Sequence, residues 1–168
     1  MEKTLVILKP DALQRGIAGE IITRFEKAGL KIVASKMIQP DREHYYKHYE
    51  DIGQMVTRRG QKAFDVTLEM MLMGPVLAIV LEGIEAISLV RKMVGTTEPK
   101  SAAPGTIRGD YAHMSFAYAD SQDTGIPNLI HASGDASDAE KEIGHWFAEN
   151  EIFDYKAVHE QYTQTKKK

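Results

Sequence analysis

One histidine of this sequence stands where it could serve as a nucleophile. His131 lies near the end of the apolar run 128–132, shortly before a segment with helical periodicity. That segment begins with residues 137–140, whose serine and glutamate have the spacing of a helix N-terminal capping box. Glu142, on the same helix, is then close enough to orient the imidazole. A carboxylate that holds one ring nitrogen fixes the tautomer and leaves the other nitrogen free to attack, so the pair could perform covalent catalysis.

A simpler interpretation of the same pair needs no catalysis. His131 would be a strand-end histidine with satisfied hydrogen bonds, and Glu142 would be a solvated residue of the helix. Because a strand, a turn and a helix carrying His and Glu are a common arrangement, the spacing alone does not decide between the two interpretations.

The elements that must position these residues alternate between strands and helices. Short apolar runs predict strands at residues 5–8, 31–37, 76–81 and 128–132. Helical spacing and helix-start signals predict helices at residues 21–28, 40–49, 61–71, 86–93 and 137–146. Residues 96–127 show no such pattern and are predicted to be irregular. The order βαββαβ, with extra helices between the second and third strands, predicts an α/β (α+β) protein with a ferredoxin-like split βαβ fold, a four-stranded antiparallel sheet covered by helices.

Length and composition favour one domain. With 168 residues, of which 43% are hydrophobic, the chain can bury a single core. We expect residues 1–168 to form one domain that ends, from about residue 157, in a loosely ordered tail with solvated lysines at 166–168. A formal charge of −3 offers no basic surface that would require nucleic acid as a partner. The absence of cysteine and of any apolar stretch long enough to span a membrane makes a cytoplasmic protein the default expectation.

Phosphate chemistry is often marked by a glycine-rich loop, and neither G-x-x-x-x-G-K-[ST] nor G-x-G-x-x-G occurs in this sequence. Any phosphate would therefore be held by side chains, for which arginine offers a planar fork and lysine a mobile charge. Lys9 follows the first strand directly, Arg91 lies at the margin of the apolar face of its helix, and Arg108 sits in the loop 105–109. Taken singly, each of these cations is more readily explained as a surface or snorkelling side chain.

Longer stretches of the sequence resemble a known family. Asn-Leu-Ile-His-Ala-Ser at 128–133, followed by Ala-Glu-Lys-Glu-Ile at 139–143, is similar to the active-site signature of the nucleoside diphosphate kinases. Thr-Leu-Val-Ile-Leu-Lys-Pro-Asp at 4–11 resembles the start of the same family, and further similar segments lie at 14–16, 19–21, 74–76, 82–83, 95–99 and 104–110. These segments keep the family's order and extend from near the start of the chain to Trp146.

The resemblance implies a kinase that moves the γ-phosphate of a nucleoside triphosphate to a nucleoside diphosphate. The transfer would follow a ping-pong mechanism through a phosphohistidine at His131, with Glu142 orienting the ring and Ser133 bridging to Glu142. The remaining matched positions contact the nucleotide or assist the transfer: Arg91, Thr97 and Arg108 at the distal phosphates, Lys9 and Asn128 at the sugar 3′-hydroxyl, Lys9 also at the leaving oxygen, and Tyr49 beside the phosphohistidine.

The same resemblance implies the cofactor and the partners. These are Mg²⁺, ATP and other nucleoside tri- and diphosphates, and further copies of the chain in a hexamer, with a tetramer as the alternative. No carboxylate cluster for a metal is evident, so Mg²⁺ is expected to arrive on the nucleotide phosphates. Neither a membrane nor nucleic acid is required. The aromatic residues of 111–118, Phe153 and Tyr155 offer apolar surface for symmetric contacts.

Two segments depart from the family pattern. The family's Pro-Phe-Phe piece is absent between Tyr49 and Gly74, where a longer loop includes residues 55–64. Phe64 is the candidate for the ring that stacks on the base, although a helix-face aromatic could equally belong to the core. Residues 111–127 are also longer than usual, and this segment could reshape the pocket or an oligomer contact. A smaller change, Ser-Gly-Asp at 133–135 instead of Ser-Asp, is expected to affect the helix cap more than the chemistry.

Two other functions remain open. A binding or regulatory module could keep the fold with an inactive pocket, although every matched polar position is intact. His44 and His48, four residues apart, could hold a metal, but no third ligand is in view and a solvated helix face is favoured.

Overall fold

The computed structural model describes residues 1–163 and is built around a four-stranded antiparallel sheet. The strands are β1 (Glu2–Leu8), β2 (Lys31–Ile38), β3 (Val76–Gly83) and β4 (Ile130–Ala132), in the spatial order β2-β3-β1-β4. This order and the connections through helices confirm the predicted ferredoxin-like split βαβ fold. The register places Ile7 of β1 opposite Ala78 on one side and His131 on the other.

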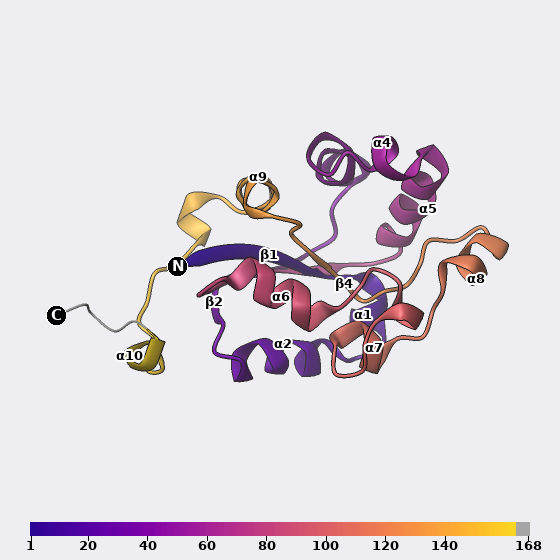
Figure 1. Cartoon of the computed structure of the whole chain (residues 1–168). Coiled ribbons are helices and arrows are strands. Elements are labelled where there is room, and N and C mark those ends of the chain that lie inside the picture. The colour runs from indigo at the N-terminus through magenta and orange to yellow at the C-terminus, as the bar shows by residue number, and fades with distance from the viewer. Residues whose placement is uncertain (164–168) are drawn as a thin grey trace.

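Helices cover both faces of the sheet (Figure 1). Along β1, Leu5 and Ile7 belong to one buried cluster, and Val6 and Leu8 belong to a second cluster on the opposite face. The first cluster is completed by α3 (Arg42–Tyr46), α5 (Gln61–Met71) and α9 (Ala136–Trp146). The second is completed by α2 (Ala18–Lys27), α6 (Ala86–Val94) and α7 (Ile107–Tyr111). Since residues directly opposite in an antiparallel pair share a face, His131 lies on the face of Ile7, which α9 covers.

The connection between β2 and β3 is more irregular than the sequence predicts. The expected helix at 40–49 begins as α3 and widens into a π-helical turn over Lys47–Ile52, a feature often found at functional sites. A further short helix, α4 (Met55–Arg59), precedes α5 and was not expected. The widened turn lies beside the site, because it carries both His48 and Tyr49.

Residues 96–127 contain short helices rather than only irregular chain. They hold a 3₁₀ turn at Pro99–Ser101, α7 and α8 (Phe116–Ser121). These segments are too short to show apolar periodicity and are instead fixed by side-chain caps, Thr106 at α7 and Ser115 at α8. Other short elements are α1 (Pro10–Gln14), a 3₁₀ turn at Glu149–Glu151 and α10 (Glu160–Thr163).

The predicted capping box of α9 is wrong. The helix begins at Ala136, and its N-cap is Asp135, whose side chain accepts a 2.9 Å hydrogen bond from the Asp138 backbone N–H. Asp135 has extended backbone angles, so it caps the helix two residues earlier than Ser137 would.

The tail is held further along the chain than predicted. Lys31, which is buried, forms a 3.0 Å ion pair with Glu160 and a second ion pair, at 2.8 Å, with Glu82. The lysines at 166–168 lie outside the described residues. Among residues 1–163, no helix combines the length and apolar character needed to cross a lipid bilayer.

Candidate active site

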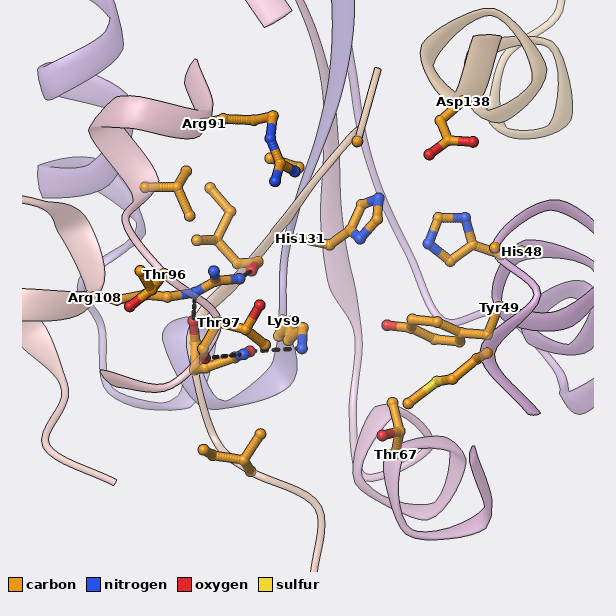
Figure 2. A pocket seen from close by; sticks show the side chains of 18 of the residues that line it. Lys9, His48, Tyr49, Thr67, Arg91, Thr96, Thr97, Arg108, His131 and Asp138 are labelled. Carbon is orange, nitrogen blue, oxygen red and sulfur yellow. Dashed lines mark hydrogen bonds between the residues drawn. The ribbon is translucent and has the colours of Figure 1, made fainter. Parts of the chain in front are cut away.

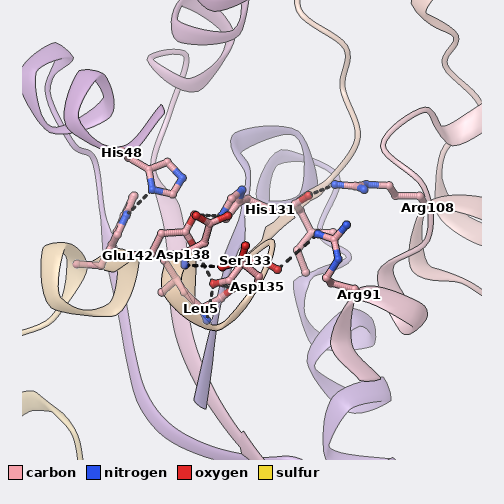
Figure 3. A network of polar contacts seen from close by, with 11 residues as sticks. Leu5, His48, Arg91, Arg108, His131, Ser133, Asp135, Asp138 and Glu142 are labelled. Atoms are coloured by element: carbon pink, nitrogen blue, oxygen red, sulfur yellow. Dashed lines mark hydrogen bonds and ion pairs between the residues drawn. The ribbon is translucent and has the colours of Figure 1, made fainter. Parts of the chain in front are cut away.

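The predicted nucleophile and its carboxylate meet across the sheet face. His131 Nε2 lies 2.9 Å from Glu142 Oε1, and the Ser133 hydroxyl donates a 2.6 Å hydrogen bond to Glu142 Oε2 (Figure 3). Glu142 extends from α9, whereas His131 and Ser133 come from β4 and the residue that follows it. Both oxygens of this buried carboxylate are therefore engaged, one by the ring and one by the hydroxyl.

Ser133 also fixes the end of β4, which is only three residues long. The Leu5 backbone N–H donates a 3.1 Å hydrogen bond to Ser133 Oγ, and the Ser133 backbone N–H donates to the Leu5 carbonyl at 3.1 Å. The hydroxyl thus links the central strand β1 to the carboxylate that holds the ring.

The ionisation of Glu142 follows from two opposing influences. Burial favours the neutral acid, but the His131 ring and the Ser133 hydroxyl outweigh it and keep the pKa of Glu142 below its usual value. A charged Glu142 accepts the Nε2–H of His131, so the opposite ring nitrogen, Nδ1, keeps its lone pair.

Several cations line the pocket that contains His131, and three of them, Arg108, Arg91 and Lys9, lie on the side away from α9 (Figure 2). Arg108 is buried and donates to the carbonyls of Asn128 at 3.1 Å, Gly95 at 3.0 Å and Ile130. Burial and the neighbouring Arg91 lower its pKa to about 10, which still leaves it charged at neutral pH. Arg91 is exposed and makes one long contact, 3.5 Å to the Ser133 carbonyl.

The third cation, Lys9, is buried at the end of β1. Its ammonium donates a 2.7 Å hydrogen bond to Asn128 Oδ1, and the Asn128 amide donates to the Thr97 carbonyl at 2.9 Å. Burial and repulsion from Arg108 lower the pKa of Lys9 to about 8. These contacts bring Lys9, Thr97 and Asn128 together, although they lie far apart in the sequence.

A strained residue helps to place β4, and sequence reasoning did not identify it. Leu129 is fully buried and has a left-handed backbone with φ of 71°, which costs about 1–3 kcal/mol for a residue with a side chain. Its N–H donates to Asp11 Oδ2 at 3.0 Å, and its carbonyl accepts from the Lys9 N–H at 2.9 Å. The strain is therefore held by contacts from the segment that follows β1.

The π-helical turn brings Tyr49 and His48 to the opposite side of the pocket (Figure 2). Burial raises the pKa of Tyr49 well above its usual value, so the phenol is protonated, and its hydroxyl has no hydrogen-bond partner among the described residues. The ring centroid of His48 is 4.6 Å from that of His131, and that of Tyr49 is 6.5 Å from it.

The interpretation of His44 and His48 changes with the structure. His48 is only 1% exposed, so the pair is not a solvated helix face. His44 instead stacks on His145 at a centroid distance of 3.9 Å. The one metal-competent group found among residues 1–163 consists of His48, His131 and Glu142, whose ligand atoms lie within 4.8 Å of one another.

The structure contradicts the predicted stacking role of Phe64. Its side chain is 4% exposed, belongs to the first core cluster and packs edge-on against Tyr46 at 5.7 Å. The pocket, of about 560 Å³, is lined in this region by residues that sequence reasoning missed: Met55, Arg58, Arg59, Thr67, Thr96 and Ile126. Four of them, Met55, Arg58, Arg59 and Ile126, lie in the longer segments 55–64 and 111–127, and this position was the only signal for them in the sequence.

Comparison with known proteins agrees with this geometry. A model of the family "Nucleoside diphosphate kinase" matches residues 2–152. The nucleoside diphosphate kinase of Borreliella burgdorferi is 45% identical over 158 residues, which are 93% of each chain, and that of Pyrococcus furiosus is 48% identical over 92% of this chain and 88% of its own.

Solved structures are similar as well. A transition state mimic of the nucleoside-diphosphate kinase from Borrelia burgdorferi, with bound vanadate and ADP, has a TM-score of 0.93 and 43% identity, covering 96% of this chain and 95% of that one. A Halobacterium salinarum nucleoside diphosphate kinase in complex with CDP has a TM-score of 0.82 and 36% identity, covering 96% and 97%.

Fold, site and relatives together define a phosphotransferase with a histidine nucleophile. More particularly, the chain belongs to the nucleoside diphosphate kinase family. Its activity is the transfer of the γ-phosphate of a nucleoside triphosphate to a nucleoside diphosphate.

Proposed function

We propose that Nδ1 of His131 carries the phosphoryl group between the two half-reactions of this kinase. The observation that supports the assignment is the 2.9 Å contact between His131 Nε2 and Glu142, which leaves Nδ1 as the ring nitrogen with a free lone pair. In the first half-reaction this lone pair attacks the γ-phosphorus. An N–P bond forms as the bond to the β-phosphate oxygen breaks, and its electron pair leaves with the diphosphate. The second half-reaction reverses these steps with another diphosphate.

The cations would stabilise charge on the transferring group. Arg91 and Arg108 lie on the same side of His131 (Figure 2), where guanidinium groups can bind the distal phosphates together with Thr97. Lys9 would neutralise the leaving oxygen, and Lys9 and Asn128 would contact the sugar 3′-hydroxyl. Tyr49, whose buried hydroxyl has no hydrogen-bond partner within residues 1–163, would donate to the phosphoryl group from the other side.

Magnesium would enter this site bound to the nucleotide phosphates rather than to protein ligands. The ion prefers six oxygen ligands, and the metal-competent group of the described residues offers one carboxylate already shared by His131 and Ser133. Bound to the phosphates, Mg²⁺ would supply positive charge that offsets the charge developing on the transferring group. The pocket's cations would then hold the phosphate oxygens that the metal leaves free.

The base would rest against apolar side chains rather than on an aromatic ring. Met55 of α4 and Ile126 of the loop before β4 line the pocket and replace Phe64 as our candidates. Contacts of this kind use the faces of the base and do not read its edge, so purine and pyrimidine nucleotides would both be substrates.

Residues 1–168 would form a single domain. The proposed assembly of the chain is a homohexamer, with a tetramer as the alternative. Exposed aromatics support symmetric contacts, namely Phe116, Tyr118, Phe153 and Tyr155. Light scattering should give six times the chain mass, and a monomer at working concentration would reject the proposal. A cytoplasmic location belongs to the same proposal and is supported by a cysteine-free sequence.

Covalent labelling tests the central assignment. Incubation with γ-labelled ATP and Mg²⁺ should leave a label on the protein that acid removes and alkali does not, as expected for phosphate on nitrogen. Any nucleoside diphosphate should discharge it. His131→Ala should abolish both steps, because no neighbouring group replaces a covalent nucleophile. Label on Ser133, or transfer by the His131→Ala protein, would overturn the mechanism.

A further inference from the structure

His48 is a buried histidine beside the nucleophile, and the mechanism above gives it no role. It is 1% exposed and lines the pocket, with its ring 4.6 Å from that of His131 at an interplanar angle of 80°. Figure 3 shows it on the same side of His131 as Glu142 and opposite the two arginines. The two rings are therefore in contact, edge to face.

Trp146 fixes the tautomer of this ring. The indole N–H, which can only donate, gives a 3.1 Å hydrogen bond to His48 Nδ1, so Nδ1 must accept. Burial and the neighbouring histidines keep the pKa of His48 well below its usual value, and the ring is neutral. A neutral ring that accepts at Nδ1 carries its single proton on Nε2.

That Nε2–H has no partner among the described residues. It is a fully enclosed donor, and burying a donor without an acceptor is costly. The hydroxyl of the adjacent Tyr49, also enclosed and unpartnered, lies at the same pocket. Two unpaired polar groups beside one nucleophile indicate that the site is completed by something that accepts hydrogen bonds.

An anion fits this donor better than a metal ion does. His48, His131 and Glu142 have the residue types and spacing of a transition-metal site. However, a histidine binds a metal through the lone pair of a ring nitrogen. In His48, Nδ1 accepts from Trp146 and Nε2 carries the proton, so neither nitrogen has a free lone pair. The phosphoryl oxygens carried by His131 are anionic acceptors that match such a donor.

We infer that His48, locked by Trp146 as the Nε2–H tautomer, donates a hydrogen bond to the phosphoryl group on His131. This assigns His48 a catalytic contact and Trp146 a positioning role, and it rests on the proposed phosphohistidine at His131. The donor acts in both half-reactions, since the same oxygens are present whichever diphosphate leaves or enters.

Substitutions separate this role from simple packing. His48→Phe keeps a ring and removes the donor, so the rates of phosphorylation and discharge should both fall about 10- to 100-fold, with little change in nucleotide dissociation constants. His48→Gln, whose amide can place an N–H near the position of Nε2, should recover part of the rate. Equal losses in both variants, or none in either, would overturn the inference.

A double-mutant cycle tests the role of Trp146. Trp146→Phe frees the His48 tautomer and should slow transfer, whereas adding it to His48→Phe should cost nothing further. Independent, additive losses would show that Trp146 does not act through His48.

A spectroscopic measurement on the unmodified chain avoids any folding defect of the variants. Nitrogen-15 NMR should show His48 protonated at Nε2, and this N–H proton should move downfield when His131 is phosphorylated. An unchanged N–H resonance after phosphorylation of His131 would reject the hydrogen bond. A wild-type protein that is not phosphorylated by ATP would instead reject the phosphohistidine itself. Titration with Zn²⁺ alone tests the alternative. Stoichiometric binding that removes the His48 N–H resonance would identify a metal site and overturn the inference.

Discussion

Lys9 Nζ donates a 2.7 Å hydrogen bond to Asn128 Oδ1, which joins the end of β1 to the loop before β4 across 119 residues of sequence. The amide of Asn128 continues the chain of contacts to the Thr97 carbonyl at 2.9 Å. Residues proposed to touch the sugar and the phosphates are thus positioned before any nucleotide arrives, which lowers the entropic cost of binding.

Lys9 should give the enzyme a basic limb in its pH profile. The pKa of Lys9 is lowered to about 8 by burial and by Arg108, so the ammonium is lost as the pH rises through this value. Because the cation would neutralise the leaving oxygen, kcat/KM should decline above pH about 8. Steady-state rates over a pH series at saturating Mg²⁺ measure the effect.

Lys9→Arg is the matched control for this limb. A guanidinium stays charged across the same range, so the decline near pH 8 should disappear. The overall rate should be lower, since the larger group does not fit the buried position. A limb that persists in Lys9→Arg would assign it to another group.

Arg108 and Arg91, which both line the pocket, should respond differently to truncation. Arg108 supports three backbone carbonyls from within the protein, so Arg108→Ala should reduce the free energy of unfolding by about 2–4 kcal/mol as well as slow both half-reactions. Arg91 is exposed and makes one long contact, so Arg91→Ala should slow transfer with a stability change within about 1 kcal/mol. Denaturant melts and single-turnover rates test the pair, and equal stability losses would contradict the assignment.

Glu142→Gln should retain phosphorylation but slow it by about 10- to 100-fold, because the amide can still accept from Nε2 without stabilising positive charge on the ring. Ser133→Ala leaves that charge in place and removes one hydrogen bond of Glu142, so its effect should be smaller. Rapid-quench labelling compares the two, and a larger loss in Ser133→Ala would show that placement of β4 matters more than the charge.

The sheet and the principal helices could be predicted because their signals are local. Apolar runs such as that of β1 and the helical stripe of α2 are repeated within one element, and each repeat adds to the signal. The segments that were missed, α4 and α7 among them, are five residues long and depend on a cap or a turn, so no period exists to be read.

The residues of the site likewise fall into those that local patterns predict and those that depend on distant contacts. His131 and Glu142 lie in elements with strong patterns, and their pairing follows from register and face. Leu129 and His48 could not be recognised, since the strain of one and the tautomer of the other depend on Asp11 and Trp146, which are distant in the sequence. Phe64 was misassigned because an aromatic residue in a longer loop resembles a stacking platform until its burial is known.

The base contact can be separated from the core by comparing Phe64 with Met55. Phe64→Leu removes packing from the first cluster and should reduce the free energy of unfolding by about 1–2 kcal/mol, without changing KM for nucleotides. Met55→Ala removes an apolar pocket wall, so KM should rise about 5- to 10-fold with only a small loss of stability. The rise should be similar for adenine, guanine, cytosine and uracil nucleotides, because a contact with the face of the base does not distinguish them. Diphosphate series measured on both variants provide the comparison; a KM effect confined to Phe64→Leu would restore the stacking role to Phe64, and an effect of Met55→Ala on one base alone would show that the pocket reads the edge of the base.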